Sequence, residues 1–264
     1  MKDISGALLI STYNWPEALN LLLKSIALQE VMPDEILIAD DGSKPATKDL
    51  IDSYRDKINA PIKHVWHEDN GFRKTIILNK ALAKCTSDYI MQVDGDCILH
   101  PKFVKDQKEF AQQGFYLYGT RVHLKIKHVQ RILKEEKATF SFFNTVLKKR
   151  ARRLRIPFLA YKAKPHDSVS PKLRGCNMSF WRSDILKING FNESIQGWGR
   201  SDSELAIRLH NIGVKAKRIK FMGFVYHLDH IETDKSRVDM NIGVENKTIK
   251  DKIVWAENGL DKYL

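Results

Sequence analysis

The first hundred residues alternate short apolar runs with amphipathic stretches, and this order constrains the fold more than any other feature. Four apolar runs have strand character: 6–11, 35–39, 62–66 and 89–93. The stretches between them carry apolar residues at helical spacing: 16–29, 45–57 and 74–84. Strands separated by helices need crossover connections, so this order predicts an α/β protein with a mostly parallel sheet covered on both faces.

Polar clusters follow each predicted strand. Thr12, Tyr13 and Asn14 come after the first strand, 40–43 after the second, and 67–73 after the third. Ligands of open parallel sheets bind beyond the carboxyl ends of the strands. The sequence therefore predicts a binding site along this edge of the sheet.

Two carboxylates, Asp94 and Asp96, flank Gly95 where the fourth predicted strand ends. Hard divalent cations prefer oxygen ligands, and such a turn can hold Mg²⁺ or Mn²⁺ against a diphosphate. Asp and Gly are also common in turns that bind nothing. The pattern favours a metal cofactor because a second acidic turn, at Asp41, falls on the same predicted edge.

Asp41 can accept hydrogen bonds from a nucleotide base or a ribose hydroxyl, so we predict that it binds a nucleotide. The segment 70–74 places Arg73 at a predicted helix start, where a guanidinium and backbone amides can hold a phosphate. Gly71 permits a close backbone approach. Solvated surface charge is the alternative for this segment.

The segment 197–205 holds Trp198 between two glycines and Asp202 at the start of a predicted helix that ends near residue 211. A tryptophan face can stack on a sugar ring. Asp202 can cap its helix or act as a general base toward an acceptor hydroxyl, and the sequence leaves both roles open.

His227 follows an apolar run, 217–226, that predicts one further strand, and His230 lies three residues later. An imidazole nitrogen there can complete a metal site that a carboxylate begins. The sequence does not decide which histidine is the ligand. No CxxC or HExxH pattern accompanies the pair, so a zinc site is disfavoured.

These motifs together resemble the family 2 glycosyltransferases. The resemblance extends over 4–230 through ISTYNWP, IADDGS, DNGFRK with the later Asn79, VDGDCILHP, RGCNMSFWR and GWGRSDSELAIRLHNIG. The last motif resembles the galactosyltransferase-type segment of β4-galactosyltransferases and chondroitin-polymerase-like enzymes. The resemblance implies the GT-A fold, a Rossmann-like nucleotide-diphospho-sugar transferase fold with a mixed, mostly parallel sheet flanked by helices.

The resemblance also implies a role for each matched residue. Asp202 corresponds to the catalytic base, and Ser201 stands where the family usually has glutamate, which leaves acceptor recognition open. Asp96 and His227 correspond to metal ligands, and Trp198, Gly199 and Ser201 to acceptor-binding positions. The donor-binding positions are Thr12, Tyr13, Asn14, Asp41, Gly71, Arg73, Asn79, Asp94 and Gly95.

The implied domain organisation is a single GT-A catalytic domain over 1–230 followed by a C-terminal extension, 231–264. Within the domain, 1–120 forms the nucleotide-sugar-binding half and 165–230 the acceptor and catalytic half. A basic helical insertion, 121–164, lies between them. No internal repeat or low-complexity tract divides the chain further.

The implied function is an inverting, metal-dependent transfer of Gal, Glc, GlcNAc or GalNAc from a UDP-sugar to a glycan or lipid-linked saccharide. Such a reaction belongs to the synthesis of a surface polysaccharide or lipopolysaccharide. A sugar-phosphate nucleotidyltransferase is the nearest alternative, but STYNWP is not a glycine-rich phosphate loop. A basic nucleic-acid-binding protein is disfavoured because the aromatic residues precede the arginine-rich run instead of alternating with it. We therefore expect no nucleic-acid partner.

Charge is concentrated in 121–164, which holds 14 of the 44 Lys and Arg residues and only two acidic ones, so it accounts for the whole net charge of +12. Such a segment either contacts an anionic membrane surface or forms a solvated helical face. Three cysteines without a CxxC pair fit a reducing cytoplasm. We expect a cytoplasmic protein, with peripheral attachment to the cytoplasmic face of the inner membrane as the alternative to a freely diffusing one.

Overall fold

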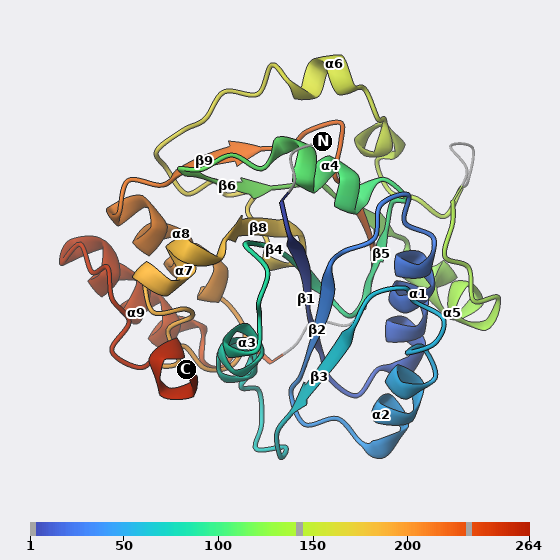
Figure 1. Cartoon of the computed structure of the whole chain (residues 1–264), viewed down its shortest axis with the longest axis horizontal. Helices are drawn as coiled ribbons and strands as arrows, with labels where there is room; N and C mark the ends of the chain where they lie inside the picture. Colours follow the sequence, from blue (N-terminus) through green and yellow to red (C-terminus); the bar gives the residue numbers. More distant parts are fainter. Residues whose placement is uncertain (1–3, 141–144, 231–233) are drawn as a thin grey trace.

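A central sheet of seven strands organises the chain in the computed structural model, which describes residues 4–140, 145–230 and 234–264 (Figure 1). The strand order is β3-β2-β1-β4-β8-β6-β9. Their bounds are β1 (Gly6–Thr12), β2 (Glu35–Asp40), β3 (Ile62–Trp66), β4 (Tyr89–Asp94), β6 (Phe115–Tyr118), β8 (Met178–Trp181) and β9 (Lys215–Arg218). The first four in sequence pair in parallel, β8 pairs antiparallel with β4 and β6, and β6 pairs in parallel with β9. The predicted mixed, mostly parallel sheet is confirmed.

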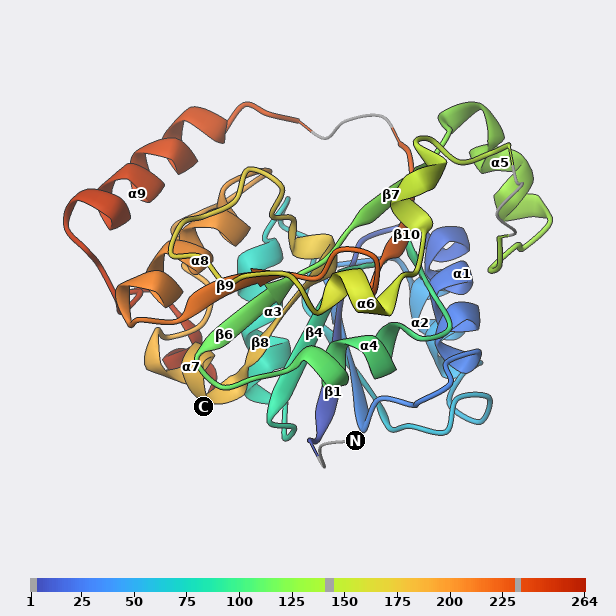
Figure 2. The same ribbon diagram turned by 90° about the horizontal axis from the view of Figure 1, so that it is seen from above.

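Helices cover both faces of this sheet (Figure 2). One face packs against α1 (Pro16–Ala27) and α4 (Phe103–Phe110), with α2 (Pro45–Asp52) beside α1. The other face packs against α3 (Lys74–Ala83), α7 (Arg182–Lys187) and α8 (Ser201–Asn211). Alternate side chains of β1 enter the two cores: Leu8 and Ile10 face α1, while Ala7 and Leu9 face α3. This two-sided burial explains why β1 is apolar along its whole length.

A second, three-stranded sheet joins β5 (Cys97–Leu99), β10 (Val225–Leu228) and β7 (Arg121–Leu124), with β10 in the middle. The single strand predicted over 217–226 was therefore wrong, because the chain forms β9 in one sheet and β10 in the other. Phe221 and Gly223, with φ of 70° and 53°, lie between them in the left-handed region. This backbone redirects the chain from the large sheet to the small one, which places His227 beside Asp96.

The basic segment 121–164 is helical only in part. It begins with β7 and continues through α5 (Ile126–Lys134), the 3-10 helix η1 (Arg150–Arg153) and α6 (Pro157–Ala160). Arg155 pairs with the buried Asp106 of α4 at 2.7 Å, and Arg153 donates to the Phe140 carbonyl at 2.9 Å. Arg155 therefore holds the segment to the domain, while Arg153 joins two parts of the segment itself.

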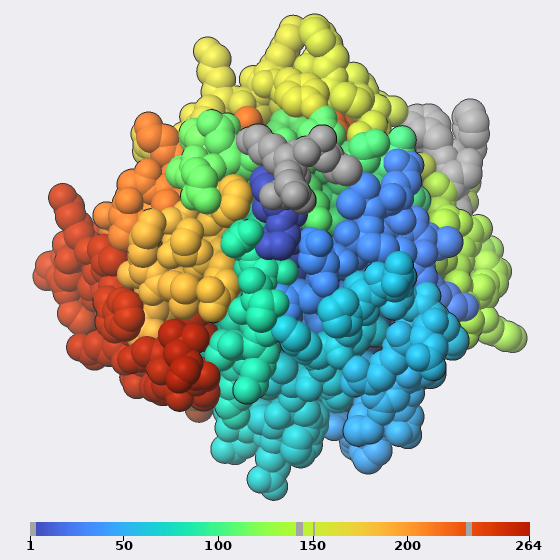
Figure 3. Space-filling model, in the orientation of Figure 1, coloured from blue at the N-terminus to red at the C-terminus, as the bar shows by residue number. Residues whose placement is uncertain are grey.

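Residues 234–264 include a long helix, α9 (Val238–Lys250), and the 3-10 helix η3 (Leu260–Tyr263). Helix α9 packs on α8, and η3 packs on α3 through the buried Leu260. Figure 3 shows this C-terminal part lying directly against residues 180–215. The weak pattern in the sequence thus hides a helix that contributes to the packed domain. No helix within the described ranges has the length and apolar character needed to cross a membrane.

Glu35, the first residue of β2, fixes the turn that leads into β4. Its buried carboxylate accepts hydrogen bonds from the backbone amides of Thr86 and Ser87 at 2.8 and 2.7 Å, and Lys63 pairs with it at 2.6 Å. Burial alone would raise the pKa of Glu35, but Lys63 and these donors lower it from 4.5 to about 2.

Glu35→Gln is expected to lower the free energy of unfolding at pH 7 by about 1.5–3 kcal/mol, the usual range for hydrogen bonds to a charged group. Because the pKa of Glu35 is lower in the folded state, its contribution is full above pH 4.5 and is lost as the pH falls from about 4.5 to about 2. Urea unfolding of both proteins between pH 7 and pH 3 measures this, and a difference that does not change with pH would contradict it.

Candidate functional site

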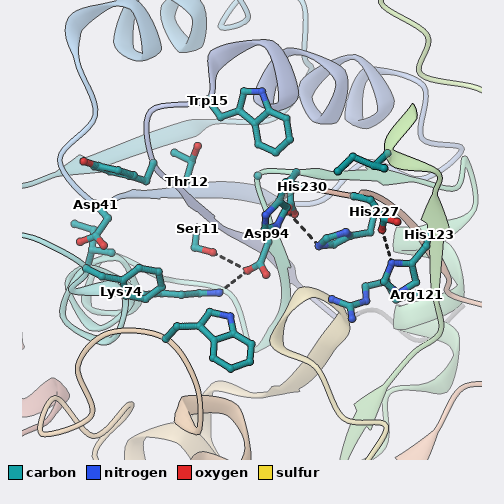
Figure 4. Close-up of a pocket in the computed structure, with 18 of the residues that line it drawn as sticks. Ser11, Thr12, Trp15, Asp41, Lys74, Asp94, Arg121, His123, His227 and His230 are labelled. Atoms are coloured by element: carbon teal, nitrogen blue, oxygen red, sulfur yellow. Dashed lines mark hydrogen bonds and ion pairs between the residues drawn. The ribbon is translucent and has the colours of Figure 1, made fainter. Parts of the chain in front are cut away.

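A cavity of about 590 Å³ opens at the carboxyl ends of β1 and β4, between the two sheets (Figure 4). Eight separate segments of the chain contribute to its wall. The lining residues are Ser11, Thr12, Tyr13, Trp15, Asp41, Phe72, Lys74, Ile77, Asp94, Gly95, Asp96, Arg121, His123, Ile126, Lys148, Trp198, His227, Asp229 and His230. The predicted edge of the sheet therefore carries a cavity large enough for a nucleotide sugar.

Asp41 marks one end of the cavity, next to Thr12 (Figure 4), and its charge also acts on the Tyr13 hydroxyl. Its Oδ1 pairs with Nε2 of the buried His67 at 2.7 Å, and its Oδ2 accepts the Arg73 backbone amide at 2.9 Å. Burial raises the pKa of Asp41, against the opposing effect of His67 and the amide. These contacts hold the carboxylate in one orientation toward the cavity.

Asp94 lies in the middle of the cavity and is bound by two donors. Its Oδ1 accepts from the Ser11 hydroxyl at 2.7 Å and from Lys74 Nζ at 2.6 Å. Burial alone would lower the pKa of Lys74, but Asp94 and Asp202 outweigh burial and raise it above its usual value. Lys74 is therefore a fixed ammonium inside the cavity, close to both carboxylates.

Asp96, the other carboxylate of the DGD turn, faces two histidines. Its Oδ2 lies 3.1 Å from Nε2 of His227 and 3.1 Å from Nε2 of His230. Burial opposes the charged forms, but the ion pair raises the pKa of His227 and lowers that of Asp96. Nδ1 of His227 is buried without a partner among the described residues.

One carboxylate oxygen and two imidazole nitrogens within 4.8 Å of one another form a donor set that suits Mn²⁺ and related divalent ions. A second group, His123, His227 and Asp229, meets the same distance limit. Its Asp229 is also paired with Lys148, a positive charge that would compete with a metal ion for that carboxylate. The chemistry of the residues therefore fits a cation best at Asp96.

Asp202 lies in the first turn of α8 but does not cap that helix, whose N-cap position is Arg200. Its Oδ2 accepts the Gly175 backbone amide at 2.7 Å, while its Oδ1 is buried with no partner in the described part of the chain. Only glycine fits at 175, because a Cβ there would lie 2.2 Å from Asp202 Oδ1. Burial raises the pKa of Asp202, Lys74 opposes this, and Asp94 adds to it.

Trp198 lines the cavity and is 44% exposed. The loop that carries it is held by α9: Asn241 Nδ2 donates to the carbonyls of Gln196 and Gly199 at 2.9 and 3.1 Å. Gly199 has a φ of 99°, which a residue with a side chain rarely adopts. A large apolar face is thereby presented to the cavity at a fixed position.

The family model "Glycosyl transferase family 2" matches residues 7–167, which is more than half of the chain. The chain belongs to this family. A second model, "N-terminal domain of galactosyltransferase", matches residues 156–231, the part that contains Trp198 and Asp202.

Curated relatives of this family 2 chain include two bacterial enzymes. Chondroitin synthase of Escherichia coli is 24% identical over 87% of this chain and 36% of its own length. Validoxylamine A glucosyltransferase of Streptomyces hygroscopicus subsp. limoneus is 25% identical over 79% of this chain and 48% of its own length. The chain thus spans about half or less of the length of these relatives.

Solved structures of similar fold include Staphylococcus aureus TarS 1-349 in complex with UDP-GlcNAc, at a TM-score of 0.62 and 15% identity over 98% of this chain and 69% of that one. The mannosyltransferase PcManGT of Pyrobaculum calidifontis, in complex with GDP-Man and Mn²⁺, has a TM-score of 0.59 and 15% identity over 94% of this chain and 64% of that one. At these identities the likeness establishes the GT-A fold alone.

Several positions that the family 2 resemblance predicts for donor binding do not line the cavity. The side chain of Asn79 is fully buried, and its amide binds the backbone of Phe191 and the Glu193 carboxylate.

The side chains of two further positions bind other parts of the chain. Asn14 accepts a hydrogen bond from the Lys44 backbone amide at 2.8 Å, and the Arg73 guanidinium donates one to the Glu68 carbonyl. Gly71 also does not line the cavity. It has a φ of 76° and turns the backbone before α3 begins.

Sequence reasoning about the family motifs missed some residues of the cavity wall. Lys74, and not Arg73, supplies the cation, because the first turn of α3 directs its side chain toward Asp94. Arg121 and His123 enter from β7, where they alternate with buried Val122 and Leu124. That alternation in the sequence was the available signal for a half-buried strand.

Asp202→Asn is expected to raise the free energy of unfolding at pH 7, because the raised pKa of Asp202 means that its ionised form destabilises the folded state. The advantage of the variant should shrink as the pH falls toward 3.8, where wild-type Asp202 becomes protonated in both states. Denaturant unfolding at pH 7 and pH 4 tests this. A variant that is clearly less stable than wild type at pH 7 would contradict it.

Proposed function

We propose that this chain is the catalytic unit of an inverting, metal-dependent glycosyltransferase that uses a UDP-sugar. The observation that carries the proposal is that one cavity joins Asp41, the group of Asp96 with two histidines, and Trp198. Asp202 lies near Lys74 and is not itself a lining residue. A nucleotide, a diphosphate with its cation and an acceptor sugar need these groups in this order. The names of the relatives, a chondroitin synthase and a glucosyltransferase, support the reaction class.

The uridine of the donor would lie at the Asp41 end, with Thr12 and Tyr13 beside it. Asp41 would accept a hydrogen bond from the base, and the contact with His67 prevents its carboxylate from turning away. The diphosphate would then extend past Asp94 toward Asp96. Lys74, which is paired with Asp94, would offset the charge of the departing UDP.

Asp96, His227 and His230 would hold the divalent cation, so both histidines serve as ligands in this proposal. A bound Mn²⁺ or Mg²⁺ would supply positive charge to the diphosphate and thereby make UDP a better leaving group.

Asp202 would act as the base. Its unpartnered Oδ1 would accept the proton of an acceptor hydroxyl while that oxygen attacks the anomeric carbon and the bond to UDP breaks. One displacement inverts the configuration, so an α-linked donor gives a β-linked product. The raised pKa of Asp202 makes it a stronger base than an exposed aspartate.

Trp198 would stack on the acceptor sugar, with Gly199 and Ser201 at the same end of α8. The transferred sugar would be Gal, Glc, GlcNAc or GalNAc, and the product part of a surface polysaccharide or lipopolysaccharide. The division into a nucleotide-sugar half, a basic segment, an acceptor half and a C-terminal part also remains a proposal.

Peripheral attachment to the cytoplasmic face of an anionic membrane is a further part of this proposal. Exposed basic side chains of the segment 121–164 support it, including Lys127, Lys134 and Lys164. Several such residues near anionic lipid, each worth about 1 kcal/mol, would hold the protein reversibly.

Asp96→Asn and His227→Ala are each expected to weaken Mn²⁺ binding in the presence of UDP by at least about tenfold, because each removes a ligand atom. His230→Ala should have an effect of similar size. Electron paramagnetic resonance of free Mn²⁺ during a titration gives the affinities.

His123→Ala is the matched control, because His123 belongs to the competing group with Asp229. It should leave the Mn²⁺ affinity within about twofold of wild type. A large loss of Mn²⁺ affinity in His123→Ala, together with no loss in Asp96→Asn, would place the cation in the group of His123 and Asp229 and contradict this assignment.

Asp202→Asn is expected to lower UDP release from a panel of UDP-sugars by about a hundredfold or more, the range for loss of a general base. UDP affinity should change little, because Asp202 does not contact the nucleotide end of the cavity. A coupled UDP assay and calorimetric UDP titration measure the two quantities.

Asp239→Asn provides a control of equal charge, because Asp239 is an exposed residue in the first turn of α9. Its UDP release should match wild type. Equal losses of UDP binding and UDP release in Asp202→Asn would show that the role of Asp202 is wrongly assigned. Pyrophosphate formation from UTP and a sugar phosphate would instead support a nucleotidyltransferase.

A further inference from the structure

A second cavity, of about 510 Å³, adjoins the first and shares Arg121 and His123 with it. We call it the basic pocket. None of the described residues that line it is acidic. Its six permanent cations come from four separate segments: Arg121, Arg152, Lys172, Arg174, Arg218 and Lys220.

The six positive charges around the basic pocket repel one another. The folded state would be more stable if these charges were spread over the surface. Two polar groups in the wall are also left unsatisfied. Thr120 is 6% exposed, and its hydroxyl has no hydrogen-bond partner among the described residues. Nε of Arg218 is also buried and has no hydrogen-bond partner among them. Buried donors of this kind are normally paired, so they indicate a place for a ligand.

The backbone holds the wall of the basic pocket in shape. Phe221 adopts a φ of 70°, which is rare for a bulky residue, and its carbonyl accepts the Ile156 amide at 3.0 Å. Lys220 Nζ lies 4.5 Å from the centre of the Phe221 ring. Strained backbone that the surrounding structure fixes is more frequent at binding sites than elsewhere.

The basic pocket lies on the acceptor side of the proposed reaction centre. Arg174 precedes Gly175, whose amide binds Asp202, the proposed base. Figure 4 shows Arg121 and His123 at the end of the first cavity opposite to Asp41. A molecule whose hydroxyl reaches Asp202 can therefore extend into the basic pocket while a nucleotide occupies the Asp41 end.

We propose that the acceptor is an anionic glycan and that the basic pocket binds one of its oxyanions, a phosphate or a carboxylate. The group would lie on a unit next to the one that receives the sugar. Arginine forks pair with such groups through two parallel hydrogen bonds, and the Thr120 hydroxyl would donate a further one. This inference rests on the proposed function, because it takes Asp202 as the base.

The test uses the full chain loaded with UDP and Mn²⁺, so that the donor end is occupied, and titrates it with glucose 6-phosphate, glucuronate and glucose. Binding is followed by nuclear magnetic resonance of the ligands. We expect the two anions to bind and glucose to bind at least about tenfold more weakly, because only the anions meet the cations of the basic pocket.

Two variants locate the binding. The triple variant R152Q/K172Q/K220Q should weaken glucose 6-phosphate at least about tenfold, whereas the charge-matched K127Q/K134Q/K164Q, away from the pocket, should stay within about twofold of wild type. Thr120→Val removes only the unpaired hydroxyl, so it should weaken the same ligand without lowering the free energy of unfolding. Equal losses in the two triple variants would mean diffuse charge and would overturn the proposal, as would equal binding of glucose and glucose 6-phosphate.

A lipid headgroup is the other source of such a phosphate. Vesicles of phosphatidylglycerol are therefore sedimented with wild type and R152Q/K172Q/K220Q. Vesicle binding that depends on these three residues, without binding of glucose 6-phosphate, would assign the basic pocket to lipid and refute the acceptor. UDP titration of wild type is run as a separate experiment. Absence of UDP binding would contradict the proposed function, but it would not contradict the binding of oxyanions in the basic pocket.

Discussion

The parallel pairing of β1 with β2 and β4 is the constraint on which the candidate site depends. Its register places Thr12 beside Asp40 and Ser11 beside Asp94, so three polar strand ends meet at one edge. The strands cannot slip by one residue, because both faces of β1 are buried and a slip would exchange the two cores. The apolar packing of the sheet therefore fixes the carboxylates within hydrogen-bonding distance of their partners.

A second constraint joins the small sheet to this edge. β10 pairs with β5 directly after the DGD turn, with His227 opposite Cys97, and thereby brings a histidine from late in the chain to Asp96. Asp202 reaches the same region from α8 through the Gly175 amide. Each proposed chemical group comes from a different element, and backbone hydrogen bonds, not loop conformation alone, hold the groups together.

Much of this could be predicted from the sequence, because strand ends, the DGD turn and the HLDH segment are local patterns. The fold and the family were confirmed, whereas the roles of individual site residues stay proposals. The prediction of one strand over 217–226 was wrong, and Lys74 was not predicted as a lining residue. Both outcomes depend on the direction that the backbone takes at a single position. A left-handed residue such as Phe221 leaves no periodic signal, and the choice between Arg73 and Lys74 depends on how α3 begins. The basic pocket could not be predicted from the sequence either, because its six cations come together only when four separate segments fold.

The central claim is that one cavity at the sheet edge holds a uridine diphosphate and a divalent cation at the same time. Calorimetric titration of the full chain with UDP, in Mn²⁺ and in EDTA, tests it most directly. We expect Mn²⁺ to tighten UDP binding by at least about tenfold and UDP to tighten Mn²⁺ binding by the same factor, because the coupling between two sites is reciprocal. Equal UDP affinity in Mn²⁺ and in EDTA would contradict it.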